Sequence, residues 1–309
     1  MKQSFKIGTR GSKLALWQAN HVSWLLSDKN PNIKTELTII KTTGDAVLNS
    51  PLSELGGKGV FVKEIEDALL SEKIDIAVHS MKDVPTIQPE GLTIAAVIER
   101  HDPSDALVSK DGLKLSELPH GSRVGTGSLR RASQLLNCYP GLEIVPIRGN
   151  VDTRVRKLKD GEDYDAIILA VAGLERMGLK EEITEVIPSK LMLPAPGQGI
   201  IALECREQDS DTVSLLKTIN DKETEFQANA ERAFLMKLGG DCNIPAACLA
   251  TLSGDNVKLE GVISSPDGKK IIRMHQSGTP DKSHKLGEEL ADSILKSGGF
   301  EILDQISNS

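Results

Sequence analysis

Short apolar segments alternate with segments of helical periodicity through the first two thirds of the chain, and this alternation limits the possible folds most strongly. Residues 74–78 and 166–171 are predominantly apolar, which is typical of strands buried on both faces of a parallel sheet. Further strands are expected around 6–9, 37–40, 123–126 and 143–147, and helices over 12–26, 61–70, 128–137 and from about 151. Regular alternation of strands and helices predicts an α/β fold of doubly wound layers.

The last third has a different pattern. Polar and apolar residues alternate over 257–262 and 270–274, which predicts antiparallel strands, and helices are expected over 223–237 and 284–295. This part should therefore form a small α+β domain. The segment 193–199 before it contains two prolines, and we interpret it as a stiff connection between lobes. With 309 residues, the chain is long enough for two or three domains.

The composition excludes several classes of protein. A formal net charge of −7 argues against a general nucleic-acid binder, and 3% aromatic residues argue against a surface on which bases stack. No apolar run approaches the ~18 residues of a membrane span, and the first residues lack the pattern of a signal peptide. The four cysteines have neither Cys-x-x-Cys spacing nor a zinc-ligand cluster around them. We therefore expect a cytoplasmic monomer with free thiols, no metal site and no membrane partner.

A basic stretch contrasts with this acidic background. Residues 121–160 hold eight Lys or Arg and only three Asp or Glu. Helix N-termini attract anions, and guanidiniums bind carboxylates through paired hydrogen bonds. The stretch therefore predicts a site for a carboxylate-rich ligand in the crevice at the strand ends, and a solvated basic helix face is the alternative. The candidates at its two strand-to-helix turns are Thr126, Ser128, Arg130, Arg131, Arg148 and Arg154.

The first third of the chain contains a matching set of groups. The segment from Thr9 to Ser12 again ends a strand and begins a helix that Ser12 can cap, which makes Arg10 and Ser12 candidate anion ligands. Lys58 lies in a glycine-rich loop. The loop lacks the spacing of a nucleotide-binding P-loop, and an ordinary flexible loop is the alternative.

A single carboxylate follows the buried strand at 74–78. Asp83 stands beside Lys82, and Ser80 is expected at the same strand end. In an anion-binding site, such a carboxylate can stabilise developing positive charge and transfer protons. A structural capping role is the alternative for Asp83, and His79 is expected to be structural.

Cys242 lies in a tight polar loop directly after two glycines and one acidic residue. Glycines allow a sharp turn, and a thiolate is a strong nucleophile. This presentation suits a thiol that carries a covalently bound group. A buried, inert thiol is the alternative, and we assign Cys138, Cys205 and Cys248 to that class.

Seven segments, in the same order along nearly the whole chain, resemble the porphobilinogen deaminase family, also called hydroxymethylbilane synthases. They are Ile7–Ser12, Gly56–Gly59, Val78–Asp83, Gly127–Arg131, Arg148–Arg154, Pro194–Gly199 and the Cys242 loop. The resemblance implies three domains, with two lobes similar to those of periplasmic binding proteins and a third domain that bears the cofactor loop. The expected bounds are 1–99 with 199–217 for lobe 1, 104–193 for lobe 2 and 221–309 for the C-terminal α+β domain.

The resemblance also implies an activity. Members of this family are transferases that condense four porphobilinogen molecules head to tail into hydroxymethylbilane, with release of ammonia, in the biosynthesis of tetrapyrroles such as haem. A dipyrromethane cofactor, joined to Cys242 by a thioether, would act as primer, and the product would pass to uroporphyrinogen III synthase. Asp83 would be the catalytic residue. The residues implied to bind cofactor and substrate are Arg10, Ser12, Lys58, Ser80, Lys82, Thr126, Ser128, Arg130, Arg131, Arg148, Arg154 and Arg176.

Two other functions are compatible with the arginines and the lobes. A two-lobed receptor for a small dicarboxylate would use the same groups, although it would leave the Cys242 loop unexplained. An enzyme that acts on a C–N bond with an unattached organic cofactor is the second alternative. Covalent attachment of the cofactor distinguishes the predicted family from both.

Overall fold

The computed structural model describes residues 2–43, 62–161, 163–240 and 244–307. The chain forms two compact units. The first comprises Met1–His101 and Ile200–Glu225, and the second comprises Asp102–Gly199 and Phe226–Ser309. Each unit is therefore built from two stretches of chain, because the polypeptide leaves the first unit and later returns to it.

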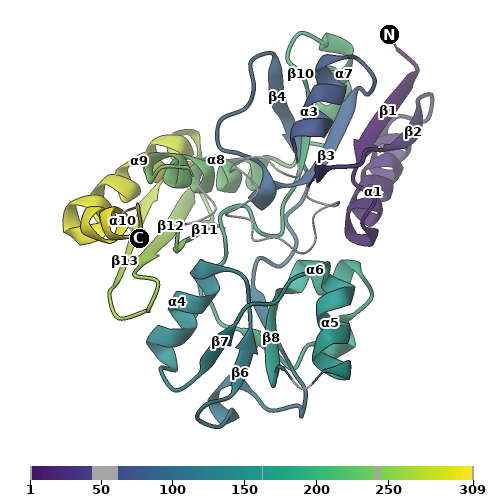
Figure 1. Ribbon diagram of the computed structural model, residues 1–309. Helices are drawn as coiled ribbons and strands as arrows, with labels where there is room; N and C mark the ends of the chain where they lie inside the picture. Colours follow the sequence, from purple (N-terminus) through teal and green to yellow (C-terminus); the bar gives the residue numbers. More distant parts are fainter. Residues whose placement is uncertain (1, 44–61, 162, 241–243, 308–309) are drawn as a thin grey trace. The chain divides into compact units, whose positions relative to one another are not determined.

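The first unit is built on a five-stranded sheet in the order β2-β1-β3-β10-β4. Strands β2, β1 and β3 are parallel, and β10 is antiparallel to both of its neighbours. Figure 1 shows α1, α3 and α7 around this sheet. The apolar side chains of α1 and α7 pack on one face of it and those of α3 on the other. The elements are β1 (Ser4–Thr9), α1 (Lys13–Lys29), β2 (Lys34–Ile39), α3 (Lys63–Leu70), β3 (Ile76–Ser80), η1 (Met81–Asp83), β4 (Leu92–Val97), β10 (Ile201–Arg206) and α7 (Ser210–Lys217).

The second unit contains a five-stranded sheet of the same kind, in the order β7-β6-β8-β5-β9. Strands β7, β6 and β8 are parallel, and β5 is antiparallel to both of its neighbours. Helices α5 and α6 cover one face and α4 the other. The elements are β5 (Asp105–Ser109), η2 (Leu115–Glu117), β6 (Arg123–Gly125), α4 (Leu129–Cys138), β7 (Glu143–Val145), α5 (Val151–Asp160), β8 (Ala166–Ala170), α6 (Val171–Arg176), η3 (Lys180–Glu182) and β9 (Glu185–Ile187).

The second unit also contains a three-stranded antiparallel sheet in the order β11-β12-β13, with α8, α9 and α10 packed on it. Gly287 permits a close approach of α9 to α8, because an added Cβ would lie 2.2 Å from the carbonyl oxygen of Ala230. The elements are α8 (Lys222–Lys237), β11 (Ala246–Ser253), β12 (Asn256–Ser264), β13 (Ile271–Gly278), η4 (Pro280–Lys282), α9 (Ser283–Ile294), η5 (Leu295–Gly299) and α10 (Phe300–Ser307).

The predicted fold class is confirmed: two layered α/β sheets and a small α+β part. The strand expected at 74–78 lies at Ile76–Ser80, because the backbone N–H of Ile74 still closes the turn after α3. The elements that were not expected from the sequence include β4, β5, α6, β9, α7, β11 and α10. In the described part of the chain, no helix is long and apolar enough to cross a membrane.

The cysteine predictions are partly confirmed. Cys205 and Cys248 are buried, and burial raises the pKa of the Cys205 thiol to about 12. The burial predicted for Cys138 is wrong, because this residue ends α4 and is exposed. Its position at a helix terminus leaves fewer neighbours to cover the side chain than a position within a strand does.

Candidate functional site

The first unit presents predicted site residues at one edge of its sheet. β1 and β3 are neighbours and parallel, so their carboxyl ends meet at this edge. After β1, Ser12 caps α1, and its Oγ accepts a hydrogen bond from the backbone N–H of Ala15 at 3.3 Å. The predicted cap is confirmed, and Arg10 and Ser12 are both half-buried at the start of the helix.

The end of β3 presents Asp83 on an anchored turn. Ser80, the last residue of β3, accepts a hydrogen bond from Nε2 of Gln18 at 2.9 Å. The backbone N–H of Met81 then donates to the carbonyl oxygen of Ile200 at 3.0 Å. Lys82 is half-buried and Asp83 is exposed. The exposed Asp83 therefore lies on a turn whose start is held by α1 and by the residue before β10.

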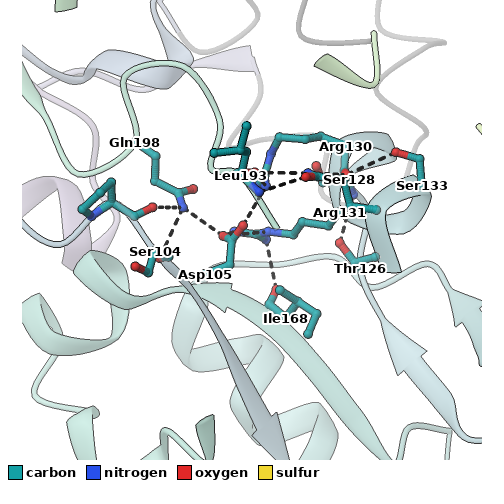
Figure 2. A network of polar contacts seen from close by, with 12 residues as sticks. Ser104, Asp105, Thr126, Ser128, Arg130, Arg131, Ser133, Ile168, Leu193 and Gln198 are labelled. Atoms are coloured by element: carbon teal, nitrogen blue, oxygen red, sulfur yellow. Dashed lines mark hydrogen bonds and ion pairs between the residues drawn. The ribbon is translucent and has the colours of Figure 1, made fainter. Parts of the chain in front are cut away.

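The two arginines of α4 are buried, in contrast to those of a solvated helix face. Arg130 and Arg131 are 5% and 6% exposed, and both bind Asp105, which is 0% exposed at the start of β5. Nη1 of Arg130 donates to Oδ2 of Asp105 at 2.7 Å. Nη2 and Nε of Arg131 donate to Oδ1 at 2.7 and 3.0 Å. Figure 2 shows the carboxylate beside both guanidiniums. We call these three residues the arginine–aspartate cluster.

The connection at 193–199 fixes the orientation of this cluster. The carbonyl oxygen of Leu193 accepts a hydrogen bond from Nη1 of Arg130 at 2.7 Å. Nε2 of Gln198 donates to Oδ1 of Asp105 at 2.9 Å (Figure 2). On the other side, Nη1 of Arg131 donates to the carbonyl oxygen of Ile168 at 3.0 Å. Each guanidinium is thus held by a carboxylate and a backbone carbonyl together.

The arginine–aspartate cluster keeps an excess of positive charge. Burial alone would raise the pKa of Asp105, but the guanidiniums of Arg130 and Arg131 outweigh it and hold that pKa far below its ordinary value. Burial also lowers the pKa of Arg130, and Asp105 opposes this shift. Two guanidiniums face one carboxylate, so one positive charge remains uncompensated within the cluster. A buried charge of this kind attracts an anionic ligand strongly, because water screens it little.

The remaining arginine candidates follow the ends of β7 and β8. These strands flank β6, and all three are parallel, so their carboxyl ends lie at one edge. Arg148 and Arg154 are half-buried, and Nε of Arg154 donates to the carbonyl oxygen of Gly149 at 2.7 Å. Arg176 is 9% exposed, and burial lowers its pKa to about 10, so it stays charged at neutral pH.

The first turn of α4 contributes hydroxyl and backbone groups. Oγ1 of Thr126, which is buried, accepts a hydrogen bond from the backbone N–H of Ser128 at 3.2 Å. Ser128 is the N-cap residue of α4 and is half-buried. By contrast, Arg156 and Lys157 on α5 are exposed. The basic stretch therefore divides into a buried part on α4 and a solvated part on α5.

Lys58 and Cys242 lie outside the described residues, but the flanks of Cys242 are described. Gly239 and Gly240 have φ values of 112° and 69°, which confirms the predicted need for glycine before the cysteine. After it, the carbonyl oxygen of Pro245 accepts a hydrogen bond from the backbone N–H of Ser264 at 3.2 Å. Oγ of Ser264 in turn donates to Oγ of Ser133 on α4 at 2.7 Å. The downstream flank of Cys242 is thus joined through β12 to the helix of the arginine–aspartate cluster.

Sequence reasoning missed Asp105 and Gln198. The signal for Asp105 was an acidic residue directly before the apolar run Ala106–Val108, whose burial requires a positive partner. Gln198 lies in the segment Pro194–Gly199 that resembles the family, but the sequence did not indicate its contact with Asp105. In the described residues, no group of three His, Cys, Asp or Glu side chains is arranged to hold a metal ion.

Comparison with known families identifies the relationship. A model of the porphobilinogen deaminase dipyromethane cofactor binding domain matches residues 5–214, and a model of the porphobilinogen deaminase C-terminal domain matches residues 226–296. This chain belongs to the porphobilinogen deaminase family. The predicted family, the transferase class, the link to tetrapyrrole biosynthesis and the dipyrromethane cofactor are therefore confirmed.

Individual relatives agree over nearly the full length. The porphobilinogen deaminase of Syntrophomonas wolfei is 49% identical, over 97% of this chain and 98% of the relative. That of Trichlorobacter lovleyi is 50% identical, over 97% of this chain and 96% of the relative. Among solved structures, the methionine binding protein MetQ matches with a TM-score of 0.45 and 16% identity, over 72% of this chain and 92% of that chain.

Proposed function

We propose that this chain condenses four porphobilinogen molecules head to tail into hydroxymethylbilane, with release of ammonia at each step, on a dipyrromethane primer bound to Cys242. The observation that supports this most is the excess positive charge of the arginine–aspartate cluster. Each pyrrole ring carries an acetate and a propionate, so the growing chain accumulates carboxylates. Buried guanidiniums held in fixed orientations suit such a ligand, since they bind carboxylates in a defined geometry.

The residues of the second unit fit a group with four carboxylates. The arginine–aspartate cluster, Arg148, Arg154 and Arg176 belong to strand ends at one edge of the sheet, and we assign them to the cofactor side chains. The N-terminus of α4 adds backbone N–H groups, with Thr126 and Ser128 beside them. When bound, the dipyrromethane group supplies the pyrrole carbon to which the next ring is joined.

The residues of the first unit act on the incoming substrate. Loss of ammonia from porphobilinogen leaves a positively charged methylene-pyrrole, and we assign Asp83 to stabilise this charge and to accept and return protons of the substrate. Its exposure on the anchored turn after β3 gives the substrate access to it. The groups assigned to the substrate carboxylates are Arg10, Ser12, Ser80, Lys82 and, outside the described residues, Lys58.

We further propose three functional domains: lobe 1 over 1–99 with 199–217, lobe 2 over 104–193, and the C-terminal domain over 221–309. The three separate sheets support this division. In this proposal the enzyme acts as a monomer in the cytoplasm. It passes hydroxymethylbilane to uroporphyrinogen III synthase.

The test is the intact mass of the protein under denaturing conditions, followed by peptide mapping around Cys242. The expected result is an added mass of two porphobilinogen-derived rings on the Cys242 peptide, together with ammonia release when porphobilinogen is supplied. An unmodified protein is then incubated with porphobilinogen, and an adduct that forms identifies the apo-enzyme. If no adduct forms and no ammonia is released, the proposal is wrong and the dicarboxylate receptor is favoured. A bound pigment that dialysis removes after denaturation would favour the enzyme with an unattached cofactor.

A further inference from the structure

Three buried titratable side chains lie beside the strand that leads to Asp83. Glu66 of α3, His79 of β3 and Glu204 of β10 are 9%, 6% and 0% exposed. Nε2 of His79 lies 3.0 Å from Oε2 of Glu204. Within the described residues, Oε1 of Glu66 and Oε1 of Glu204 are buried and have no hydrogen-bond partner. Two carboxylates thus accompany one imidazole and keep two oxygen atoms that can bind a proton. We call these three residues the Glu–His–Glu cluster.

The neighbouring elements do not supply a cation to this cluster in the described contacts. Lys6 of β1 and Lys63 of α3 are exposed, and β4 contains no charged residue. Arg206, on the same strand as Glu204, binds two other carboxylates and two backbone carbonyls. Asp67 on α3 adds a further negative charge near Glu66. The cluster is therefore rich in negative charge, and this favours uptake of a proton.

The carboxyl group of Glu66 gains and loses a proton close to neutral pH. Burial and the charge of Glu204 raise the pKa of Glu66 to about 6, although the charge of His79 opposes the shift. Uptake of a proton by Glu66 therefore changes the charge that acts on the contact between His79 and Glu204 in this range. Glu66 is thus ionised above this pH and carries a proton below it.

The cluster is connected to the turn that presents Asp83. His79 directly precedes Ser80 and lies four positions before Asp83. The contact between His79 and Glu204 joins β3 to β10, and these strands remain paired up to Ser80. The backbone N–H of Met81 continues this pairing by one further hydrogen bond. A change in the contact between His79 and Glu204 therefore acts on the pair of strands that holds the turn.

We propose that the Glu–His–Glu cluster is a pH-responsive positioning device for Asp83. When Glu66 is ionised, Glu204 is bonded to His79 alone, and the end of β3 is held in its working position. When Glu66 takes up a proton from solvent, its negative charge no longer acts on Glu204, and the contact of Glu204 with His79 weakens. None of the three groups touches the substrate in this scheme, which rests on the role proposed for Asp83.

The first test is Glu66→Gln in the holoenzyme, because the amide is neutral, as the protonated acid is. At about pH 8, kcat should fall about threefold or more, with KM changed less than about twofold. The wild type should show a change of kcat around pH 6, and this change should be absent in the variant. Stability at about pH 8 should rise, because ionisation of a group whose pKa is raised in the folded state costs stability above that pKa. A purely structural contact would instead move stability and kcat together.

If Glu66→Gln kept the wild-type pH profile of kcat, the proposal would be overturned. A second measurement needs no turnover: the NMR signal of the His79 ring, identified by its loss in His79→Asn, followed against pH. Ionisation of Glu66 should produce a step near pH 6 in the wild type that is absent in Glu66→Gln. The same step in both proteins would also overturn the proposal. A wild type that shows this step but releases no ammonia would instead contradict the proposed function.

The chain offers a matched control. His284 and Glu288 form an exposed pair on α9, with Nδ1 and Oε2 at 3.8 Å. Glu288→Gln removes the same charge beside a histidine at the surface. It should leave both the pH profile of kcat and the His79 signal as in the wild type. Changes that match those of Glu66→Gln would contradict a specific role for the buried cluster.

Discussion

The two five-stranded sheets share a topology but differ in the charge that they bury. In each sheet, three parallel strands are followed by an antiparallel strand in fourth position, β10 in the first unit and β5 in the second. Each of these strands contributes one fully buried carboxylate. Glu204 of β10 contacts a histidine and acts on the like charge of Glu66, whereas Asp105 of β5 binds Arg130 and Arg131. One sheet therefore buries excess negative charge and the other excess positive charge.

This difference shows how a shared scaffold is adapted to two tasks. The topology brings several strand ends to one edge in both units, and this alone does not determine what binds there. The charges of a few buried groups do, because water screens them little. In our account the second unit holds carboxylates of the cofactor, while the first presents Asp83 to a positively charged substrate. Substitutions in one unit at a time should separate these two tasks.

The largest effect is expected for Cys242→Ala, which removes the attachment point while both sheets stay intact. The protein should fold, carry no covalent pigment and release no ammonia from porphobilinogen, because the thioether cannot form. Intact mass and an ammonia assay measure this. Cys138→Ala is the control, since Cys138 is a free and exposed cysteine, and it should keep the adduct. A Cys242→Ala enzyme with normal turnover would refute the thioether.

The next largest effect is expected for Arg131→Leu in the second unit. The substitution removes the three hydrogen bonds that Arg131 donates to Oδ1 of Asp105 and to the carbonyl oxygen of Ile168, and these buried acceptors lose a partner. This should cost about 3–5 kcal/mol of unfolding free energy and prevent stable assembly of the primer. Denaturant unfolding and intact mass measure the two effects. Arg156→Leu on α5 is the exposed control and should change stability by less than about 0.5 kcal/mol. An Arg131→Leu protein with full adduct mass would remove the cofactor role from this arginine.

A related loss, with a defined pH dependence, is expected for Asp105→Asn. The substitution keeps the shape but leaves two buried guanidiniums without a counter-charge, at a cost of about 3 kcal/mol near pH 7. The pKa of Asp105 is lower in the folded state than in the unfolded state, so its contribution is complete above the unfolded value of about 3.9. It is lost only as the pH falls through the folded value. The difference from wild type should thus be constant from about pH 5 to 8 and shrink in stronger acid. If the stability difference between Asp105→Asn and wild type already shrank at about pH 6, Asp105 would not have the low pKa that its two arginines are expected to give it.

The smallest effect is expected for Ser264→Ala, which removes the hydrogen bond to Ser133 between β12 and α4. About 1 kcal/mol of unfolding free energy should be lost, with the adduct on Cys242 intact. Ser293→Ala on α9 is the exposed control. If Ser264→Ala abolished the adduct, the fit between the Cys242 flank and α4 would matter more than the charge of the arginine–aspartate cluster.

The sequence predicted those parts of the fold that depend on neighbouring residues. The cap at Ser12, the start of α4 after Ser128, the buried strand at 166–170 and the glycines before Cys242 all follow local rules. The pattern also predicted that polar groups gather at strand ends. The roles of individual site residues remain predictions, and Lys58 and Cys242 lie outside the described residues.

The missed features depend on residues that are distant in the sequence. β10 returns to the first sheet only after the chain has formed the whole second lobe, and no local pattern specifies that it pairs with β3. Similarly, Asp105 is recognisable as the counter-ion of the arginines only once β5 is known to lie beside β8. The burial expected for Cys138 was wrong because the sequence does not show whether a thiol at a helix end faces the core or the solvent.

The division of labour between the two sheets is tested most directly by the intact masses of Asp83→Asn and Arg131→Leu, measured side by side under denaturing conditions. Our account predicts that Asp83→Asn carries the full two-ring adduct on Cys242 although its turnover falls by about 10²–10³-fold, and that Arg131→Leu lacks the adduct. An Asp83→Asn protein without the adduct, or an Arg131→Leu protein with it, would contradict the assignment of catalysis to one sheet and cofactor binding to the other.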